Sequence, residues 1–398
     1  MRHSIFIPLA LCVASARCAA DAPVPDDAAT YTVRDSAGIE IVESTRAQWR
    51  DGQQWTVSDT ALVQIGEEDG DARYLLDGVA GAVRLSDGRI VIANAGSGEL
   101  RFYDGEGRFL HASGRKGRGP GEYVRIDQLV RMPGDSLMVW DATNEVSIVA
   151  PDGAFVRRRR IDMDRVMRTI TMQRATESLT PMPDGSFIIH AMQRGDPPTR
   201  GVPPGVVYRS EIGYFHFRVD GGVDSLGWYP GGLPQMYLNI GGRPVYETML
   251  LAWHARLAVG APSRVFITLG DPYEVMEFTD GRLVRIIRRS APPVPIPPEE
   301  IRRFREARDQ RGERSRRVRE ALPEQTHYPA ILRMTVDADG YLWVRTYGEA
   351  TQVFDHAGAW LGDMDPPGSV LEIGREHVLV RLMDALGVER VSLHTLRR

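Results

Sequence analysis

Apolar and polar residues alternate in short runs along most of this chain, and the runs recur in one fixed order. Residues 85–110 read LSDGRIVIANAGSGELRFYDGEGRFL, and residues 335–361 read TVDADGYLWVRTYGEATQVFDHAGAWL with the same order of parts. In both, an Asp-Gly turn leads into an alternating apolar run, a polar loop, a second apolar run, a Gly turn and a closing run. Weaker copies lie at 132–157, 182–227 and 261–285. Self-similarity in a fixed order indicates a repeat architecture.

Each repeat contains four short runs separated by turn signals, a pattern typical of an all-β fold. A four-stranded unit that recurs about every 40–45 residues predicts the blades of a β-propeller. We expect six blades, at about 76–114, 126–161, 177–229, 252–289, 328–364 and 368–397. The last supplies only three runs, so we expect ALVQIG (61–66) to close it from the N-terminal side and cover the exposed edge. GIEIVES (38–44) also alternates and predicts an extra strand.

The connections of the repeat differ in length between the two faces of the predicted disc. In each blade, with strands a to d, the a–b and c–d turns lie on one face, and here they are tight and rich in Gly and Asp. The long connections are all b–c or d–a and lie on the other face: 66–77, 113–125, 162–176, 192–212, 229–251 and 290–327. We call these the plain face and the loop-rich face. Loops on a rigid scaffold often carry function, so we expect a ligand or partner on the loop-rich face. A face that only tolerates insertions, or packs on another subunit, is the alternative.

The longest connection, between blades four and five, predicts a helical insertion at about 297–322. Pro297, Pro298, Glu299 and Glu300 suit a helix start, and Gly312 predicts a bend. The apolar stripe is thin, so this helix is expected to lie across the face as a lid or to present itself to a partner. Its arginines are interleaved with acidic residues, which favours a solvated surface over a nucleic-acid site.

The N-terminus has the pattern of a secretory signal peptide over residues 1–20, with a basic start, an apolar run at 5–16 and small residues after it. Residues 21–54 then form a tether and extension, and 55–398 the propeller. Both cysteines, Cys12 and Cys18, lie in the signal segment, and a lipid anchor on Cys18 is the alternative to simple cleavage. The sequence after it contains no run long enough for a transmembrane helix. We therefore expect a periplasmic or extracellular protein, or one tethered to a membrane by lipid. The net charge of −4 gives no reason to expect nucleic-acid binding.

The chain resembles the bacterial secreted six-bladed β-propellers related to the NHL repeat. The residues that carry the resemblance are 85–110, GRKGRGPGEY (114–123), HYPAILRMTVDADGYLWV (327–344) and DSAGIEIVES (35–44). The resemblance covers nearly all of the mature chain and implies the fold, but no particular activity. Blades three and four depart from the consensus through large insertions.

Candidate ligand-binding residues fall in or directly after three of the long connections. In 114–123, Arg115 and Lys116 suit an anion or a sugar acid, although no phosphate-loop motif is present and Tyr123 is also expected to anchor the blade junction. Trp253 and His254 lie in the opening of the inner strand of blade four (LAWHARLAV), and His327 lies just before that of blade five. The alternative for each of these residues is a purely structural role.

A metal site is a second hypothesis for the histidines, because some NHL-type propellers are metal-dependent lyases. His190, His254 and His327 would hold Zn²⁺, or another divalent ion such as Ca²⁺, if blade order brought them together over the central funnel. No GxSxG or HExxH motif is present. The sequence thus favours a non-catalytic extracytoplasmic propeller without a cofactor, which binds a protein, peptide or carbohydrate on its loop-rich face. The alternative is a metal-dependent hydrolase or lyase, lactonase-like or of the NHL type, acting in the funnel.

Overall fold

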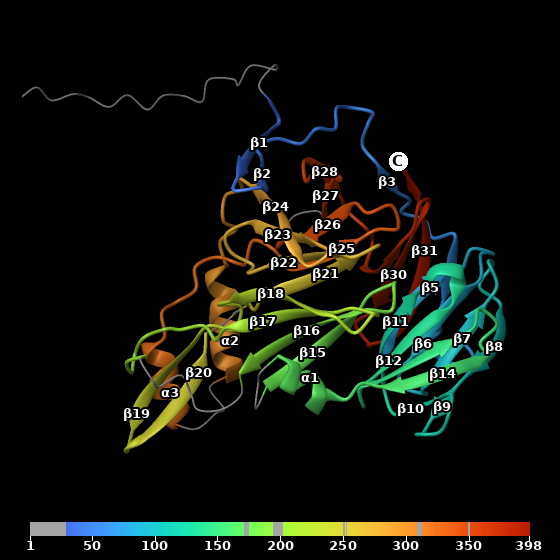
Figure 1. Cartoon of the computed structure of the whole chain (residues 1–398), viewed down its shortest axis with the longest axis horizontal. Helices are drawn as coiled ribbons and strands as arrows, with labels where there is room; N and C mark the ends of the chain where they lie inside the picture. Colours follow the sequence, from blue (N-terminus) through green and yellow to red (C-terminus); the bar gives the residue numbers. More distant parts are fainter. Residues whose placement is uncertain are drawn as a thin grey trace, which may run out of the picture.

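The computed structural model describes residues 29–170, 175–193, 202–249, 251, 253–308, 313–348 and 351–398. Six antiparallel sheets follow one another around a central axis, so the chain is the six-bladed β-propeller that the repeat predicts (Figure 1). The predicted signal peptide and the first part of the tether lie outside the described residues.

Blades one and two follow the expected order of strands. Blade one consists of β5 (Val79–Arg84), β6 (Ile90–Asn94), β7 (Glu99–Tyr103) and β8 (Phe109–Ser113). Blade two consists of β11 (Ile126–Arg131), β12 (Leu137–Asp141), β13 (Glu145–Val149) and β14 (Phe155–Arg160), with a 3-10 helix, η1 (Pro133–Asp135), in its first turn. Between the two blades, β9 (Arg115–Lys116) pairs in parallel with β10 (Glu122–Tyr123).

Blades three and four are the two that flank the large insertions. Blade three consists of β15 (Ala175–Pro181), β16 (Phe187–Gln193), β17 (Ile212–Phe217) and β18 (Val223–Tyr229). Blade four consists of β21 (Arg256–Gly260), β22 (Arg264–Thr268), β23 (Glu274–Thr279) and β24 (Arg282–Arg289). An N-terminal hairpin, β1 (Tyr31–Ser36) and β2 (Ile39–Ser44), extends blade four, because β2 pairs in parallel with β24. The extra strand predicted at 38–44 is therefore confirmed.

Blades five and six close the ring. Blade five consists of β25 (Arg333–Val336), β26 (Leu342–Arg345), β27 (Thr351–Phe354) and β28 (Trp360–Met364). Blade six consists of β29 (Ser369–Ile373), β30 (His377–Met383) and β31 (Glu389–Arg397), to which the N-terminal β4 (Val63–Ile65) and β3 (Thr56–Val57) pair. The register sets Val63 opposite Leu393 and Ile65 opposite Val391. The predicted closure by residues 61–66 is confirmed, and the red and blue strands meet in Figure 1.

A hydrophobic cluster lies between each pair of neighbouring blades. Between blades one and two, for example, Phe102 and Ile126 belong to one cluster, and between blades six and one, Leu379 and Ile92 belong to another. Burying each such side chain contributes roughly 1.5–3 kcal/mol. The six clusters therefore hold the blades as one ring and fix the positions of the loops at both faces.

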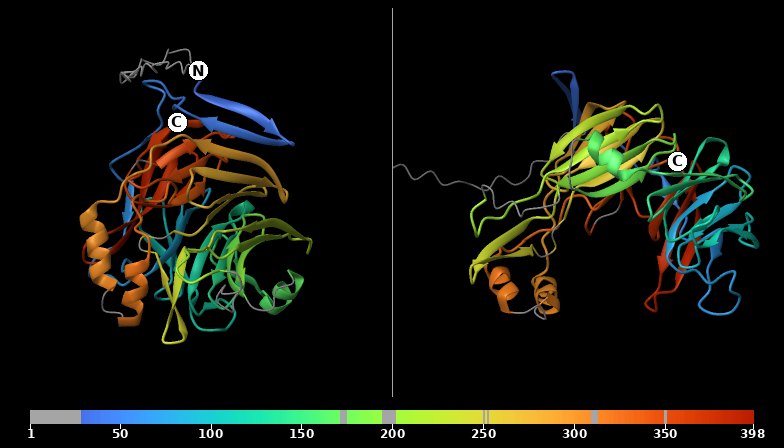
Figure 2. Two further views of the ribbon diagram at one scale, coloured as in Figure 1. Left: turned by 90° about the vertical axis from the view of Figure 1, so that its left-hand side faces the viewer. Right: turned by 60° about the horizontal axis from the view of Figure 1, so that its bottom comes forward.

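The two largest insertions pack on each other and form an arm, which we define as residues 235–248 and 298–321. It consists of a hairpin, β19 (Gln235–Ile240) and β20 (Arg243–Thr248), and of two helices, α2 (Pro298–Arg308) and α3 (Glu313–Ala321). Val318 of α3 and Met236 of β19 are fully buried in one cluster. The arm extends to one side of the blades (Figure 2). The predicted insertion is thus confirmed, as two helices, of which α3 packs on the hairpin. The predicted bend at Gly312 lies outside the described residues.

Two further elements differ from the sequence prediction. The hairpin arises within a connection predicted as loop, and its tight turn is Gly241-Gly242, both at positive φ, which glycine adopts without strain. A short helix, α1 (Met163–Thr169), follows blade two, and the Asp162 carboxylate caps it by accepting a hydrogen bond from the Arg165 backbone N–H. Its one buried residue, Val166, packs between blades two and three.

Candidate functional site

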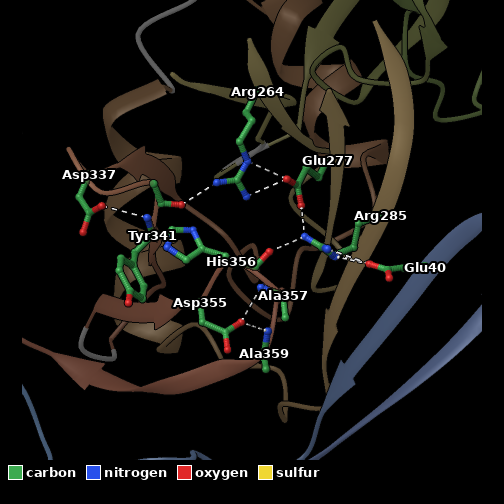
Figure 3. A network of polar contacts seen from close by, with 11 residues as sticks. Glu40, Arg264, Glu277, Arg285, Asp337, Tyr341, Asp355, His356, Ala357 and Ala359 are labelled. Atoms are coloured by element: carbon green, nitrogen blue, oxygen red, sulfur yellow. Dashed lines mark hydrogen bonds and ion pairs between the residues drawn. The ribbon is translucent and has the colours of Figure 1, made fainter. Parts of the chain in front are cut away.

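Charged groups on the plain face form a neutralised network (Figure 3). The Glu277 side chain, only 3% exposed, accepts hydrogen bonds from Arg264 Nε at 2.8 Å and Arg285 Nη1 at 2.7 Å. Arg264 Nη1 also donates to the Gly340 carbonyl of blade five at 2.7 Å, and Arg285 Nη2 donates to Glu40 of the N-terminal hairpin at 2.7 Å. Each charge has an opposite partner, so the network joins three parts of the fold and offers no group to a ligand.

A second buried carboxylate on the plain face is also fully satisfied. Asp337, whose side chain is completely buried, accepts hydrogen bonds from the indole Nε1 of Trp343 at 3.0 Å and from Arg398 Nη2 at 2.7 Å. The Arg398 guanidinium lies 4.6 Å from the ring centroid of Trp55. Because a buried charge needs a counter-charge, Arg398 acts as a structural latch between blades five and six.

The loop-rich face carries a different arrangement of charges. Arg333 and Arg345 stand directly opposite each other on the neighbouring strands β25 and β26 of blade five. Arg256, the first residue of β21 in blade four, is near enough to Arg333 for their charges to repel, and this repulsion adds to the lowering of the Arg256 pKa that burial causes. Within the part of the chain that the structure describes, neither Arg256 nor Arg333 forms an ion pair with a carboxylate, while Arg345 pairs with the exposed Asp365 at 3.1 Å. We call Arg256, Arg333 and Arg345 the arginine cluster.

Two histidines, His254 and His190, lie beside the arginine cluster on the side of blade three. His254 Nε2 contacts Arg256 Nη1, and since arginine only donates, this nitrogen accepts and the imidazole is neutral. Burial, together with Arg256, lowers the pKa of His254. His190 stands opposite Tyr214 in blade three, and burial, with a smaller effect of His254, lowers the pKa of His190 from its ordinary value of 6.5 to about 4. Both imidazoles are therefore uncharged at neutral pH.

A cavity of about 540 Å³ opens beside the arginine cluster, between blades five and six. Arg333 and Arg345 line it, together with the hydroxyl-bearing residues Thr335, Thr351 and Ser369. Its other walls are largely apolar, with Pro366, Pro367 and Val370 among them. The cavity thus combines two guanidinium groups, several hydroxyls and an apolar surface.

The predicted residues Arg115, Lys116 and Tyr123 lie at the junction of blades one and two. Arg115 and Lys116 are exposed on β9, and Arg115 Nη2 pairs with Glu122 at 2.6 Å. Tyr123 is 2% exposed and belongs to the hydrophobic cluster between the two blades, and burial raises its pKa to about 12. Tyr123 therefore anchors the junction, as the structural alternative expects. Of these three predicted residues, only Arg115 and Lys116 are exposed to solvent.

Trp253 and His327 occupy two other places on the loop-rich face. The Trp253 ring lies under the Arg209 guanidinium, at 5.2 Å from Cζ to the ring centroid, and packs against Gly270. His327 lines a cavity of about 360 Å³ between blades four and five, next to the stacked rings of Tyr328 and Tyr347, whose centroids are 3.5 Å apart. Neither residue takes part in the arginine cluster.

The three histidines of the metal hypothesis are brought together only in part. His190 and His254 are close enough for their charges to interact, while His327 lines the separate cavity just described. Among the described residues, no three side chains of His, Cys, Asp or Glu gather in a way that would hold a metal ion.

The arginine cluster was not predicted from the sequence. Arg256 and Arg333 are the first residues of the inner strands of neighbouring blades, in ARLAVG and LRMTVD. A basic residue at the same place in two successive repeats is a signal that aligning the inner strands would have revealed. Arg345 becomes visible only through the strand register that sets it opposite Arg333.

Comparisons with known proteins bear on the fold. Residues 74–167 match the model of a family described as 6-bladed beta-propeller. No functionally curated protein matches the sequence. In the structure that is described, no helix has the length and apolar character needed to cross a membrane.

Similar solved structures come from proteins of several kinds. A Bacteroides fragilis protein whose name describes it as exported is 13% identical, with a TM-score of 0.46 over 90% of this chain and 99% of that chain. A catalytically inactive virginiamycin B lyase from Staphylococcus aureus is 10% identical, with a TM-score of 0.37 over 85% and 88%. A luciferin-regenerating enzyme is 13% identical, with a TM-score of 0.37 over 82% and 94%. The family match and the six sheets of the structure together identify this chain as a six-bladed β-propeller.

Proposed function

We propose that this propeller is a non-catalytic binding protein that works outside the cytoplasm and holds a ligand or protein partner on its loop-rich face. The observation that carries the proposal is the difference in charge pairing between the two faces. Arg264 and Arg285 on the plain face share a buried carboxylate, whereas Arg256 and Arg333 on the loop-rich face have no carboxylate partner among the described residues.

Arg333 and Arg345 carry like charges on neighbouring strands, and such an arrangement works against folding. Like charges directly opposite each other on adjacent strands are destabilising. The strand register holds Arg333 and Arg345 in these positions. Such an arrangement contributes to function if an anionic group of a ligand supplies the missing negative charge. The rigid scaffold sets the guanidinium groups in place before the ligand arrives, which reduces the entropy cost of binding.

The location outside the cytoplasm rests on the predicted signal peptide at residues 1–20. Both cysteines of the chain lie within that segment, so the described residues contain no cysteine. Absence of disulfides and thiols is compatible with an oxidising compartment.

A binding test can be designed around the two faces. The purified chain is incubated with a defined library of peptides, oligosaccharides and organic acids, and bound members are detected by native mass spectrometry. The variant Arg256→Glu reverses a charge on the loop-rich face, and Arg282→Glu does the same at an exposed position on the plain face. We expect some library members to bind the unmodified chain and the Arg282→Glu variant, but not the Arg256→Glu variant.

Two results would contradict the proposal. Equal loss of binding in both variants would show that the loop-rich face is not the site. Chemical conversion of a library member, together with stoichiometric Ca²⁺ or Zn²⁺ in protein purified without a metal-affinity column, would favour the metal-dependent hydrolase or lyase instead.

A further inference from the structure

We propose that the cavity between blades five and six binds a small hydroxylated carboxylate, with Arg333 and Arg345 holding the carboxylate group. This inference rests on the proposed function and names the class of its ligand. The cavity has a volume of about 540 Å³, within the range of roughly 300–1,000 Å³ that is usual for small-molecule sites.

The two arginines are positioned for one anionic group. Arg333 and Arg345 stand in register on adjacent antiparallel strands, so their side chains leave the sheet on the same side, and both line the cavity. A guanidinium group has a planar fork of N–H donors that matches the two oxygens of a carboxylate. A ligand carboxylate bound between the guanidinium groups of Arg333 and Arg345 would offset the repulsion between their charges, which the ligand-free protein retains.

A carboxylate already occupies the rim of this site. Asp365, whose side chain is 77% exposed, accepts from Arg345 Nη1 at 3.1 Å. The pair shows that Arg345 is presented to a carboxylate oxygen arriving from the solvent side. Because the Arg345 side chain is 45% exposed and that of Asp365 is 77% exposed, solvent weakens the pair, and a ligand can displace it.

The rest of the cavity suits a hydroxylated body. Thr335, Thr351 and Ser369 line the wall, and each carries a hydroxyl that can donate or accept a hydrogen bond; the Thr351 hydroxyl also accepts from Arg345 Nη1 at 3.5 Å. Pro366 and Val370 add apolar surface, against which the carbon skeleton of a small ligand packs. A simple inorganic anion would leave these groups without contacts.

The neighbouring blade strengthens the positive field at the entrance. Arg256 Nε donates to the Leu332 carbonyl at 3.0 Å, and Leu332 itself lines the cavity. The contact ties the arginine of blade four to the segment that leads into Arg333. Arg256 thus acts as a positioning residue and adds a charge that attracts an anion toward the cavity.

The test compares three probes by isothermal titration calorimetry with the purified full chain. D-galacturonate carries the carboxylate and hydroxyls, its methyl ester keeps the hydroxyls but is neutral, and inorganic phosphate is an anion without them. We expect galacturonate to bind, the ester to bind at least tenfold more weakly, and phosphate to bind more weakly than galacturonate.

Four variants locate the binding. Arg333→Gln and Arg345→Gln are each expected to weaken galacturonate binding at least tenfold, with thermal unfolding confirming that both fold. Arg282→Gln, on the plain face, is expected to leave the affinity unchanged. Asp365→Asn removes the competing carboxylate and is expected to strengthen binding severalfold.

The contrary outcomes are distinct. Equal binding of galacturonate and its ester, equal or stronger binding of phosphate, or an unchanged affinity in both arginine variants would overturn the carboxylate site. If galacturonate does not bind while library members still bind in an Arg256-dependent way, the carboxylate site is wrong and the proposed function stands. If no library member binds either, both proposals fail.

Discussion

Replacing Arg333 with glutamine is expected to make the ligand-free protein more stable. Arg333 stands opposite Arg345 and near Arg256, and within the described residues it has no carboxylate partner. Glutamine keeps much of the side-chain length and its polar end while removing the charge. Most substitutions destabilise a protein, so a gain in stability at this position would be diagnostic of stored repulsion.

The size of the effect follows from the geometry. A directly opposed like-charge pair on adjacent strands costs roughly 0.2–1 kcal/mol. Arg333 and Arg345 are both exposed, so solvent screens part of the repulsion, while Arg256 in the next blade adds to it. We expect a gain of about 0.5–1 kcal/mol, and a rise in Tm of roughly 1–3 °C for a domain of this size.

The assay is urea unfolding at low and high salt, because guanidinium chloride would itself screen the charges. The gain from Arg333→Gln should be present at about 20 mM NaCl and nearly absent at about 1 M, where the screening length falls to about 3 Å. Arg282→Gln is the matched control, because Arg282 is exposed on the plain face. Its substitution should change the free energy of unfolding by less than about 0.5 kcal/mol at either salt concentration.

The reasoning would be refuted by either of two results. A loss of stability in Arg333→Gln would mean that the side chain makes favourable contacts that outweigh the repulsion. A gain that does not depend on salt would mean that its cause is not electrostatic.

Three other substitutions test the fold around the site. Arg398→Ala removes the counter-charge of the buried Asp337 and should lower the free energy of unfolding by about 2–4 kcal/mol. Arg397→Ala, at the exposed neighbouring position, should have little effect on stability. Equal effects of the two substitutions would show that Arg398 does not hold blades five and six together. Because the pKa of His190 is lowered in the folded protein, the unfolded chain takes up a proton at this residue first as the pH falls. The free energy of unfolding should therefore not depend on His190 above pH 6.5, and should fall by up to about 3 kcal/mol as the pH drops toward 4. His190→Gln should remove this part of the pH dependence of stability, and an unchanged pH dependence would contradict the argument. Val318→Asp places a charge in the buried cluster of the arm and should make the arm unfold at a lower temperature than the blades. Calorimetry should then show two transitions. A single transition would mean that the arm and the ring unfold together.

The blades could be predicted because their signal is local and repeated. The blades are visible in the sequence as alternating apolar runs separated by Gly and Asp turns. Blade six lacks a fourth run, so the sequence predicts a closing strand at 61–66, and β4 confirms it. The hairpin of the arm was missed because its strands interrupt the repeat, although the Gly241-Gly242 turn between two β-rich runs was a usable signal.

The arginine cluster depends on information that a repeat pattern does not contain. Arg256, Arg333 and Arg345 come together through strand register within blade five and through the packing of blade five on blade four. Blade order alone suggested that His190, His254 and His327 converge. Only the first two lie close together, because His327 lines a separate cavity between blades four and five. Which charges are left unpaired is also invisible until the partners of every other charge are known.

The central claim is that the arginine cluster on the loop-rich face binds an anionic ligand, since Arg256 and Arg333 have no carboxylate partner among the described residues. Crystals soaked in sodium bromide test it directly, because anomalous scattering locates bromide ions without any assumption about the ligand. The account predicts a bromide ion between Arg333 and Arg345, and its loss in crystals of Arg333→Gln. Bromide found only elsewhere, or retained at that place in the variant, would contradict it.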